Sequence, residues 1–518
     1  MSNPFHTIAI SLSGGGYRAT AFHLGALSYL NQVEYEETLL LQRVKLISTI
    51  SGGTFTGVSY VLTLAQGHDF KVCFDKLYTL LDNDQLAIDA LEMVNDTSKW
   101  TAKEKNKNLI NAFSEIYQAQ FCDGEHFNKL LEHETIGHLE EFCFNATDLY
   151  NTRPFRFQKT GRIGNGRMNI HKDAAAEIRL GDIMAASSCF PGGFEPMAFP
   201  QDFVREKNSL LEQEWKDKGY PNNIALMDGG ILDNQGIESV VLEGKVCDTY
   251  IVSDVSSRLA PPFMLPPTQK PGFLGRMAYK QLRWLLALMA ALGAAGMVYF
   301  WDAHPLFMIV STLVATFSSL VLLAFYLVFR GVRSAIAQEL GNQHETTDVF
   351  KNLNILKKTP LHILWKLIAV RLFSLSDILE NTFMSRIRSL QITSLYESDI
   401  WKDKVISNNI YSLFTDYKNA DHIPNPPESL VKMLEYAASM PTTLWFTDEE
   451  KRSKMLDKLI VSGQINLCFQ LLQYLNKKKK TFPPDQLPAL EALEARILAD
   501  YQRFIADEKW LLDTLKRP

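Results

Sequence analysis

The chain has 518 residues, a formal net charge of −5 and a hydrophobic content of 46%. This length predicts two or three structural units rather than one, and the slightly acidic balance argues against a dedicated nucleic-acid-binding protein. The six cysteines are scattered singly, without a CxxC pair or a secretory apolar segment at the N-terminus. We therefore expect reduced thiols in a cytosolic compartment, with no metal site and no cofactor.

The first 258 residues alternate apolar runs with helical patterns. Strands are expected at residues 7–12, 44–50, 223–227 and 249–255, each followed by small or glycine-rich residues. This alternation predicts an α/β fold around a largely parallel sheet. In such sheets the functional residues gather at the carboxyl ends of the strands.

The first strand runs into three consecutive glycines, Gly14, Gly15 and Gly16, in the stretch SLSGGGYRAT. A Walker loop would end in Gly-Lys-Ser/Thr, and a dinucleotide-binding loop would need a glycine where Ala19 stands. Nucleotide binding is therefore the less favoured interpretation. The backbone N–H groups of this loop remain suited to another negative charge.

The second strand ends in 48-STISGGTFTG-57, where Ser51 precedes Gly52 and Gly53 and a helical pattern follows. A serine on a sharp turn between a strand and a helix, with small neighbours, is typical of a nucleophile elbow. The N-terminus of the following helix would favour a developing alkoxide. A serine that only caps this helix is the alternative.

The third strand ends in 225-ALMDGGILDNQG-236, which places Asp228 beside Gly229 and Gly230. An aspartate at this place is either a turn former or a catalytic acid or base. No histidine stands at a strand end after Ser51, so Asp228 is the favoured group to activate that serine. The pattern indicates a Ser-Asp dyad.

Two long uncharged runs, at residues 284–301 and 305–329, follow the last of these strands. At 1.5 Å per residue each is about 27 Å long or longer, which is enough to cross a bilayer. Lysines and arginines flank both outer ends and none lies in the turn, so both ends are expected on the cytoplasmic side. A buried core hairpin is the alternative. The proline-rich stretch 261–272 is expected to be a stiff linker.

The remaining segments carry weaker patterns. Residues 353–373 mix apolar side chains with lysine and arginine, as in an interfacial helix or in a packed helix with a basic outer face. Residues 375–395 have a helical pattern, and residues 409–414 are expected to form a late strand. The run 477-KKKK-480 is either a lipid-attracting patch or a solvated loop.

Four motifs together resemble the patatin-like phospholipase family. In chain order they are Gly14-Gly15-Gly16-x-Arg18, the Ser51-Gly52-Gly53 elbow, 185-AASSCFPGGFEP-196 and Asp228-Gly229-Gly230. The stretch 146-ATDL-149 resembles a strand start of the family, and residues 440–463 resemble a closing segment of large bacterial members. The resemblance, over residues 5–258, implies a three-layer sandwich with a mostly parallel central sheet. A two-helix transmembrane hairpin would be inserted into it, and a helical C-terminal region would follow.

The resemblance implies a carboxylic ester hydrolase, a phospholipase A-type enzyme that releases fatty acids from glycerophospholipids. Ser51 would attack the ester carbonyl, Asp228 would take its proton, and the glycine loop 14–16 would form the oxyanion hole. Arg18 would have an orienting or phosphate-facing role. The other supporting residues implied are Gly53, Gly229, Gly230, Ser187 and Pro191.

The expected organisation has four parts: a catalytic domain at 1–258, a linker and hairpin at 259–345, a return to the catalytic fold with an interfacial helix at 346–418, and a helical region at 419–518. Membrane phospholipids are the expected substrate and anchor, and no nucleic acid is expected. The expected place is a bacterial-type inner membrane, with the catalytic domain and both termini cytoplasmic. Two alternatives stay open, a hydrolase for lysophospholipid or neutral glyceride and a non-catalytic membrane sensor or scaffold. A homo-oligomer and a regulatory ligand are also left open.

Overall fold

The computed structural model describes residues 3–83, 85–100, 105–132, 134–206, 208–242, 247–256, 270–302, 304–339, 358–420 and 422–517. The chain divides into two compact units, of which the first comprises 1–260 and 383–518 and the second comprises 261–382. The second unit is therefore inserted into the sequence of the first. Most of the predicted linker at 261–272, and the start of the predicted helix at 353–373, lie outside the described residues.

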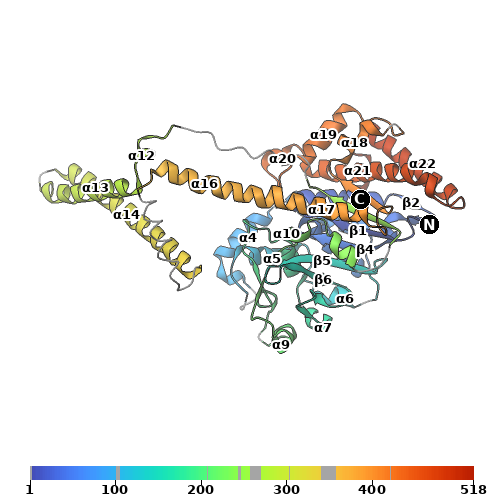
Figure 1. The fold of residues 1–518 in the computed structure, drawn as a ribbon, viewed down its shortest axis with the longest axis horizontal. Helices are drawn as coiled ribbons and strands as arrows, with labels where there is room; N and C mark the ends of the chain where they lie inside the picture. The colour runs from blue at the N-terminus through green and yellow to red at the C-terminus, as the bar shows by residue number, and fades with distance from the viewer. Residues whose placement is uncertain are drawn as a thin grey trace. The chain divides into compact units, whose positions relative to one another are not determined.

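A mixed, mostly parallel sheet forms the centre of the first unit (Figure 1). Its main path runs β12-β11-β1-β4-β5-β6-β7-β8. The strands β12, β11, β1, β4 and β5 are parallel to one another, and β6 to β8 continue antiparallel, which confirms the predicted sheet. The bounds are β1 (Ile8–Leu12), β4 (Val44–Ile50), β5 (Glu141–Asp148), β6 (Arg153–Gln158), β7 (Ile163–Gly164), β8 (Asn169–Ile170), β11 (Thr249–Asp254) and β12 (Val405–Asn409). A separate short hairpin joins β2 (Glu34–Tyr35) and β3 (Thr38–Leu39).

Two strands meet end to end along one edge of β5. Strand β4 runs parallel to β5 and pairs Ile50 with Asn145, whereas β10 (Ile224–Asp228) runs antiparallel to β5 and pairs Asp228 with Ala146. Because β6 occupies the opposite edge of β5, β4 and β10 share this edge and their carboxyl ends converge. Strand β9 (Met197–Phe199) pairs with the other edge of β10. The stretch 146–149, predicted as a strand start, is instead the carboxyl end of β5, because the apolar residues that extend the strand precede it.

Side chains alternate between the two faces of the sheet, as the period of a strand requires. Ile10 and Ile47 point into the larger core, whereas Leu46 and Tyr250 belong to a smaller core on the other face. The larger core is covered by α1 (Gly16–Leu30), α2 (Gly52–Ala65), α5 (Leu109–Gln120), α8 (Leu180–Ser188) and α21 (Met455–Lys478). The smaller core is covered by α11 (Ile237–Leu242) and α17 (Met384–Glu397).

The C-terminal region of the first unit is helical, as predicted, and α19, α21 and α22 gather into one layer (Figure 1). The predicted late strand at 409–414 is wrong, because β12 ends at Asn409 and α18 follows at once. The apolar residues Ile410, Leu413 and Phe414 recur at helical rather than alternating spacing. The remaining helices of this unit are α3 (Phe70–Asn83), α4 (Leu86–Asn95), α6 (Asn128–Leu131), α7 (Lys172–Ala175), α9 (Leu210–Asp217), α10 (Gly230–Asp233), α18 (Ser412–Asp416), α19 (Glu428–Ala438), α20 (Asp448–Arg452), α22 (Leu487–Ala506) and α23 (Trp510–Leu515).

Helices α1 and α21 cross so closely that their backbones are in contact. A Cβ atom at Gly25 of α1 would collide with the carbonyl group of Ile460, and a Cβ atom at Gly463 of α21 would collide with the carbonyl group of Phe22. Only glycine lets two helices approach this closely. The crossing joins the C-terminal region to the helix that follows the glycine loop.

The second unit contains a long helical hairpin. Its helices are α12 (Phe273–Arg276), α13 (Tyr279–Tyr299), α14 (Pro305–Glu339) and α16 (Leu361–Asp377), and the π-helical stretch η4 (Ile378–Phe383) continues from α16. The segments Tyr279–Tyr299 and Pro305–Leu327 are long and apolar enough to span a membrane, with mean hydropathies of 1.6 and 2.3. Protein covers only 11% and 6% of the two segments, which is unlike the core helix of a soluble domain.

Candidate active site

Ser51 occupies the sharp turn between β4 and α2. Its backbone has a φ of 48° and a ψ of −119°, a conformation that non-glycine residues rarely adopt and that typically costs about 1–3 kcal/mol. A Cβ atom at Gly52 would collide with the backbone of Gly16, and one at Gly53 would collide with the carbonyl of Leu12. The two glycines therefore allow the glycine loop to pack directly against the elbow.

Ser187 fixes this turn through the hydrogen bonds of its side-chain hydroxyl. Its hydroxyl accepts the Ser51 backbone N–H at 2.9 Å and shares a hydrogen bond of 2.8 Å with the Thr54 hydroxyl. It donates in turn to the carbonyl of Asn145, on β5, at 2.7 Å. Ser187, from the predicted motif 185–196, is thus a positioning residue for the elbow.

Asp228 lies at the end of β10, beside Ser51, with only 5% of its surface exposed. Its carboxylate accepts the Gly230 backbone N–H at 2.7 Å. Burial raises the pKa of Asp228 to about 6, although the neighbouring Ser51 side chain and the Gly230 N–H act in the opposite direction. The structure therefore brings the two predicted dyad residues together. A Cβ atom at Gly229 would collide with the Asn145 carbonyl, so this glycine is required by close packing.

The glycine loop connects β1 to α1. Gly15 and Gly16 have φ angles of 142° and 58°, which favour glycine. Gly14 donates its N–H to the Asn234 carbonyl at 2.9 Å, so it is not the free oxyanion donor that the sequence predicts. Within the described residues, the N–H groups of Gly15 and Gly16 have no protein acceptor. They lie at the positive end of the α1 dipole.

Arg18 joins the start of α1 to the segment 440–443. Its guanidinium donates to the Met440 carbonyl at 2.5 Å and to the Thr442 hydroxyl at 3.3 Å. Burial lowers the pKa of Arg18 to about 10. These contacts are structural, and a phosphate-facing role for Arg18 stays a prediction. Pro191 is exposed, and no contact within the described part of the chain joins it to Ser51 or Asp228.

Two residues that the sequence did not single out also shape the site. The Asn234 backbone carbonyl accepts from Gly14, and its side-chain oxygen lies against Gly14 and Gly230. The Thr443 carbonyl accepts the Tyr17 N–H at 2.8 Å and lies against Gly16. Asn234 stands within the quoted 225–236 stretch and Thr443 within the 440–463 stretch, but the sequence did not predict that either contacts the glycine loop.

His23 is buried beneath the glycine loop. Its Nε2 atom contacts the Ser13 carbonyl at 3.0 Å and its Nδ1 atom contacts the Ser253 hydroxyl at 3.0 Å. Burial lowers the pKa of His23 to about 4, so the ring is neutral near pH 7. Both ring nitrogens of His23 are engaged with these two partners and not with Ser51.

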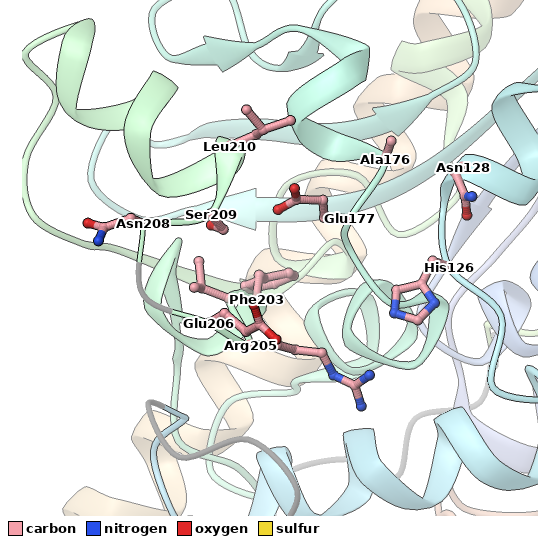
Figure 2. Close-up of a pocket in the computed structure, with 11 residues that line it drawn as sticks. His126, Asn128, Ala176, Glu177, Phe203, Arg205, Glu206, Asn208, Ser209 and Leu210 are labelled. Atoms are coloured by element: carbon pink, nitrogen blue, oxygen red, sulfur yellow. The ribbon is translucent and has the colours of Figure 1, made fainter.

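A separate cavity of about 600 Å³ lies elsewhere in the first unit (Figure 2). Its walls include His126, Glu177, Arg205 and Leu210, and they combine groups of both charges with apolar side chains. Ser51 and Asp228 do not line it. Among the described residues no group of three or more histidine, cysteine, aspartate or glutamate side chains is placed to hold a metal ion.

Comparisons with known proteins give one match to a family. Residues 10–241 match the family model described as patatin-like phospholipase. No curated protein matches the chain. This stretch contains the elbow serine, the aspartate and the glycine loop described above.

Among solved structures, human GIVD cytosolic phospholipase A2 is similar at 13% identity, over 49% of this chain and 44% of the phospholipase chain, with a TM-score of 0.33. The alignment thus spans less than half of that protein. VipD from Legionella pneumophila is similar at 12% identity, over 100% of this chain and 93% of its own, with a TM-score of 0.23. The family model, rather than these structures, is the informative comparison: residues 10–241 match the patatin-like phospholipase family.

Proposed function

We propose that the chain is a membrane-anchored lipid acyl hydrolase that releases fatty acids from glycerophospholipids through a Ser51-Asp228 dyad. The observation that carries the proposal is the strained Ser51 elbow beside the buried Asp228 carboxylate, whose pKa the Ser51 side chain lowers. Burial places the pKa of that carboxylate, at about 6, close to physiological pH. A base with such a pKa is ionised at pH 7 and still basic enough to take a proton in the transition state.

The first half of the reaction forms an acyl-enzyme. As the Ser51 oxygen attacks the ester carbonyl carbon, its proton moves to the Asp228 carboxylate, and the carbonyl oxygen becomes an oxyanion. We propose that the N–H groups of Gly15 and Gly16, which have no protein acceptor within the described residues, donate to this charge; one such donor typically lowers the barrier by about 2.7–4 kcal/mol. The tetrahedral intermediate then collapses, and the departing alcohol takes the proton from Asp228.

The second half releases the fatty acid. Asp228 removes a proton from a water molecule, whose oxygen attacks the acyl-enzyme carbonyl and forms a second oxyanion at the same donors. Collapse of this intermediate expels the Ser51 oxygen, which recovers its proton from Asp228. Ester and water are converted to acid and alcohol, and the dyad returns to its starting state.

The hairpin supports the membrane as the source of substrate. The segments Tyr279–Tyr299 and Pro305–Leu327 are about 31 and 35 Å long at 1.5 Å per residue, close to the thickness of a hydrocarbon core. We propose that both segments span the bilayer, with the ends of the chain on the cytoplasmic side. Anchoring then keeps the dyad beside its lipid substrate.

The decisive experiment is product analysis on defined lipids. The purified full-length protein is reconstituted in liposomes of one diacyl phospholipid with different acyl chains at the two positions, and the products are measured by mass spectrometry. We expect free fatty acid and lysophospholipid, and we expect Ser51→Ala and Asp228→Asn each to lower the rate by about 10³-fold or more.

Matched controls separate chemistry from folding. Asp233→Asn changes another buried acid whose pKa burial raises to about 6, but Asp233 accepts from the backbone N–H groups of Gln235 and Glu238 rather than from Ser51. It should keep most of the activity. Full activity of folded Ser51→Ala protein would refute the dyad. Release from lysophospholipid or neutral glyceride alone would favour the alternative substrates.

A further inference from the structure

We propose that the base of the hairpin, together with α16, forms a binding surface for the anionic headgroups of a phospholipid bilayer. The proposal rests on the proposed membrane anchoring. It adds that the second unit binds lipids with anionic headgroups in preference to zwitterionic ones. It concerns residues 270–382 only, and all its contacts lie within that unit.

The start of α16 is fixed beside the start of α13. The Leu361 N–H donates to the Met277 carbonyl at 2.9 Å, and the His362 Nδ1 atom contacts the Gly275 carbonyl at 2.8 Å. Ala278 and Pro360 form an antiparallel bridge at the same place. If α13 crosses the bilayer, these contacts hold the N-terminus of α16 at the level where α13 enters it.

The two hairpin helices define which end is the base. The rings of Tyr279 and Phe325 pack at 5.7 Å near the chain ends of the hairpin, and those of Phe300 and Phe307 pack at 5.4 Å beside the turn. The helices are therefore antiparallel and in register. The cations near the base are Arg276, Lys280, Arg283, Arg330 and Lys358, and Lys366 and Arg371 follow on α16.

The base carries charge of one sign. Among the described side chains of this unit, the acidic ones are Asp302, in the turn at the far end, and Asp377, at the end of α16. Lys280, Arg283 and Arg330 form no ion pair with a described acid. Cations held at a bilayer surface attract anionic headgroups, whereas a zwitterionic surface offers no net charge to them.

Helix α16 adds an apolar stripe. Leu361, Leu364, Trp365, Leu372 and Leu375 recur at the helical spacing that places them along one side. Trp365, Leu372 and Leu375 are 72%, 61% and 54% exposed, so protein does not cover the stripe. Exposed apolar side chains next to lysine and arginine are the pattern of a helix that lies in the membrane interface. A lipid surface accounts for both the stripe and the charge, whereas a protein partner would need an acidic, apolar groove.

The basic run 477–480 is a natural control. It lies in the first unit, where Lys478 pairs with Asp403 and Lys479 pairs with Glu494 at 2.9 Å. Lys477 and Lys478 end helix α21, so the run is not the solvated loop that one interpretation of the sequence expected. Its paired charges should attract headgroups much less than the unpaired cations of the base.

The test uses the full-length chain with Ser51→Ala, so that lipids are not hydrolysed. The protein is reconstituted in nanodiscs of phosphatidylcholine with about one fifth phosphatidylglycerol, and the lipids that it retains are counted by native mass spectrometry. We expect retained phosphatidylglycerol to exceed its share of the disc at least twofold. Lys280→Gln combined with Arg283→Gln should lower the retained phosphatidylglycerol to near its share of the disc, as should high salt. Lys477→Gln combined with Lys479→Gln should leave it unchanged.

Two results separate this proposal from the anchoring on which it rests. Release of the protein from membranes by alkaline carbonate would overturn the anchoring. A protein that resists this extraction but shows no phosphatidylglycerol enrichment would overturn the headgroup proposal alone. The headgroup proposal would also be overturned if the Lys280/Arg283 variant and the Lys477/Lys479 variant lost enrichment equally. The enrichment would then depend on the total charge of the protein rather than on the cations at the base of the hairpin.

Discussion

In the proposed mechanism, Asp228 would serve activity at the expense of stability. To act as the proposed base its carboxylate must be ionised, yet burial disfavours the charged form and raises its pKa to about 6. In an unfolded chain this carboxyl group would have its ordinary pKa of 3.8. The folded protein therefore binds this proton more tightly than the unfolded chain does.

The first consequence is a pH dependence of the rate. Because the base is active only when ionised, we expect the hydrolysis rate to rise through about pH 6 and to level off above it. Initial rates of fatty acid release between pH 4.5 and 8, on a lipid without titrating groups in this range, measure the profile. An unchanged rate from pH 5 to pH 8 would exclude Asp228 as the base.

The second consequence concerns stability. The favourable contribution of the neutral Asp228 is present below pH 4 and is lost as the pH rises from about 4 to about 6. Asp228→Asn removes the buried charge, so at pH 8 it should raise the free energy of unfolding by up to about 3 kcal/mol while abolishing activity. At pH 4 the variant and the parent should differ little. Denaturant unfolding at both pH values gives the comparison, and a destabilised variant at pH 8 would contradict the sign.

Local sequence was enough to predict that Ser51 stands on a turn after a strand and Asp228 at a strand end, but not which groups hold the glycine loop. A strand followed by a serine and two glycines carries its geometry within a few residues. The Thr443 carbonyl that accepts from Tyr17 is a backbone atom, and every residue type offers one. The hydrogen bond of the Gly14 N–H was unpredictable for the same reason. Its acceptor is the backbone carbonyl of Asn234, and every residue type has such a carbonyl.

At the scale of elements, a buried ionic cluster holds the helix that supports the elbow. Arg179, at the start of α8, donates to Glu115 and Asp182, and Lys105 donates to Asp182 at 2.5 Å. Burial opposes ionisation, but Arg179 and Lys105 hold the pKa of Asp182 well below its usual value. Helix α8 ends at Ser188, so the same helix carries the Ser187 hydroxyl that fixes Ser51.

Breaking this cluster should destabilise the protein strongly. Arg179→Met leaves two buried carboxylates with one cation fewer, and we expect the free energy of unfolding to fall by about 3–5 kcal/mol. Arg167→Met, at an exposed position, should change it by no more than about 0.5 kcal/mol. Chemical denaturation of both variants tests the expectation. A loss below 1 kcal/mol for Arg179→Met would show that the cluster contributes little.

The sequence predicted helical patterns between the strands but not this cluster. Its members come from a loop, α5 and α8, and their spacing along the chain follows no local period. The same limit explains the direction of β10. The carboxyl end of that strand was predicted, but an antiparallel partner depends on pairing with β5, which no single strand reveals.

At the scale of the whole molecule, the family-model match at 10–241 and the C-terminal helices are parts of one compact unit. The crossing of α1 with α21 places Gly463 against the Phe22 carbonyl. The added methyl group of Gly463→Ala would force the backbones apart, so we expect a loss of about 1–3 kcal/mol in stability. Since α1 also carries the glycine loop, the hydrolysis rate should fall as well.

Gly166→Ala provides the control for this variant. No atom lies near the position of its added methyl group, so stability and activity should stay close to those of the parent. Thermal unfolding and the rate on one defined phospholipid measure both effects. If Gly463→Ala unfolds and reacts like the parent, the C-terminal helices do not control the position of the glycine loop.

The insertion of the second unit between β11 and β12 also affects the order in which the parts of the first unit are synthesised. A ribosome makes the hairpin at 279–339 before it makes β12 and Thr443. The sheet therefore lacks an edge strand, and the Tyr17 N–H lacks its acceptor, until both apolar segments have been synthesised. The chain order thus delays completion of the candidate active site until after the hairpin has been made.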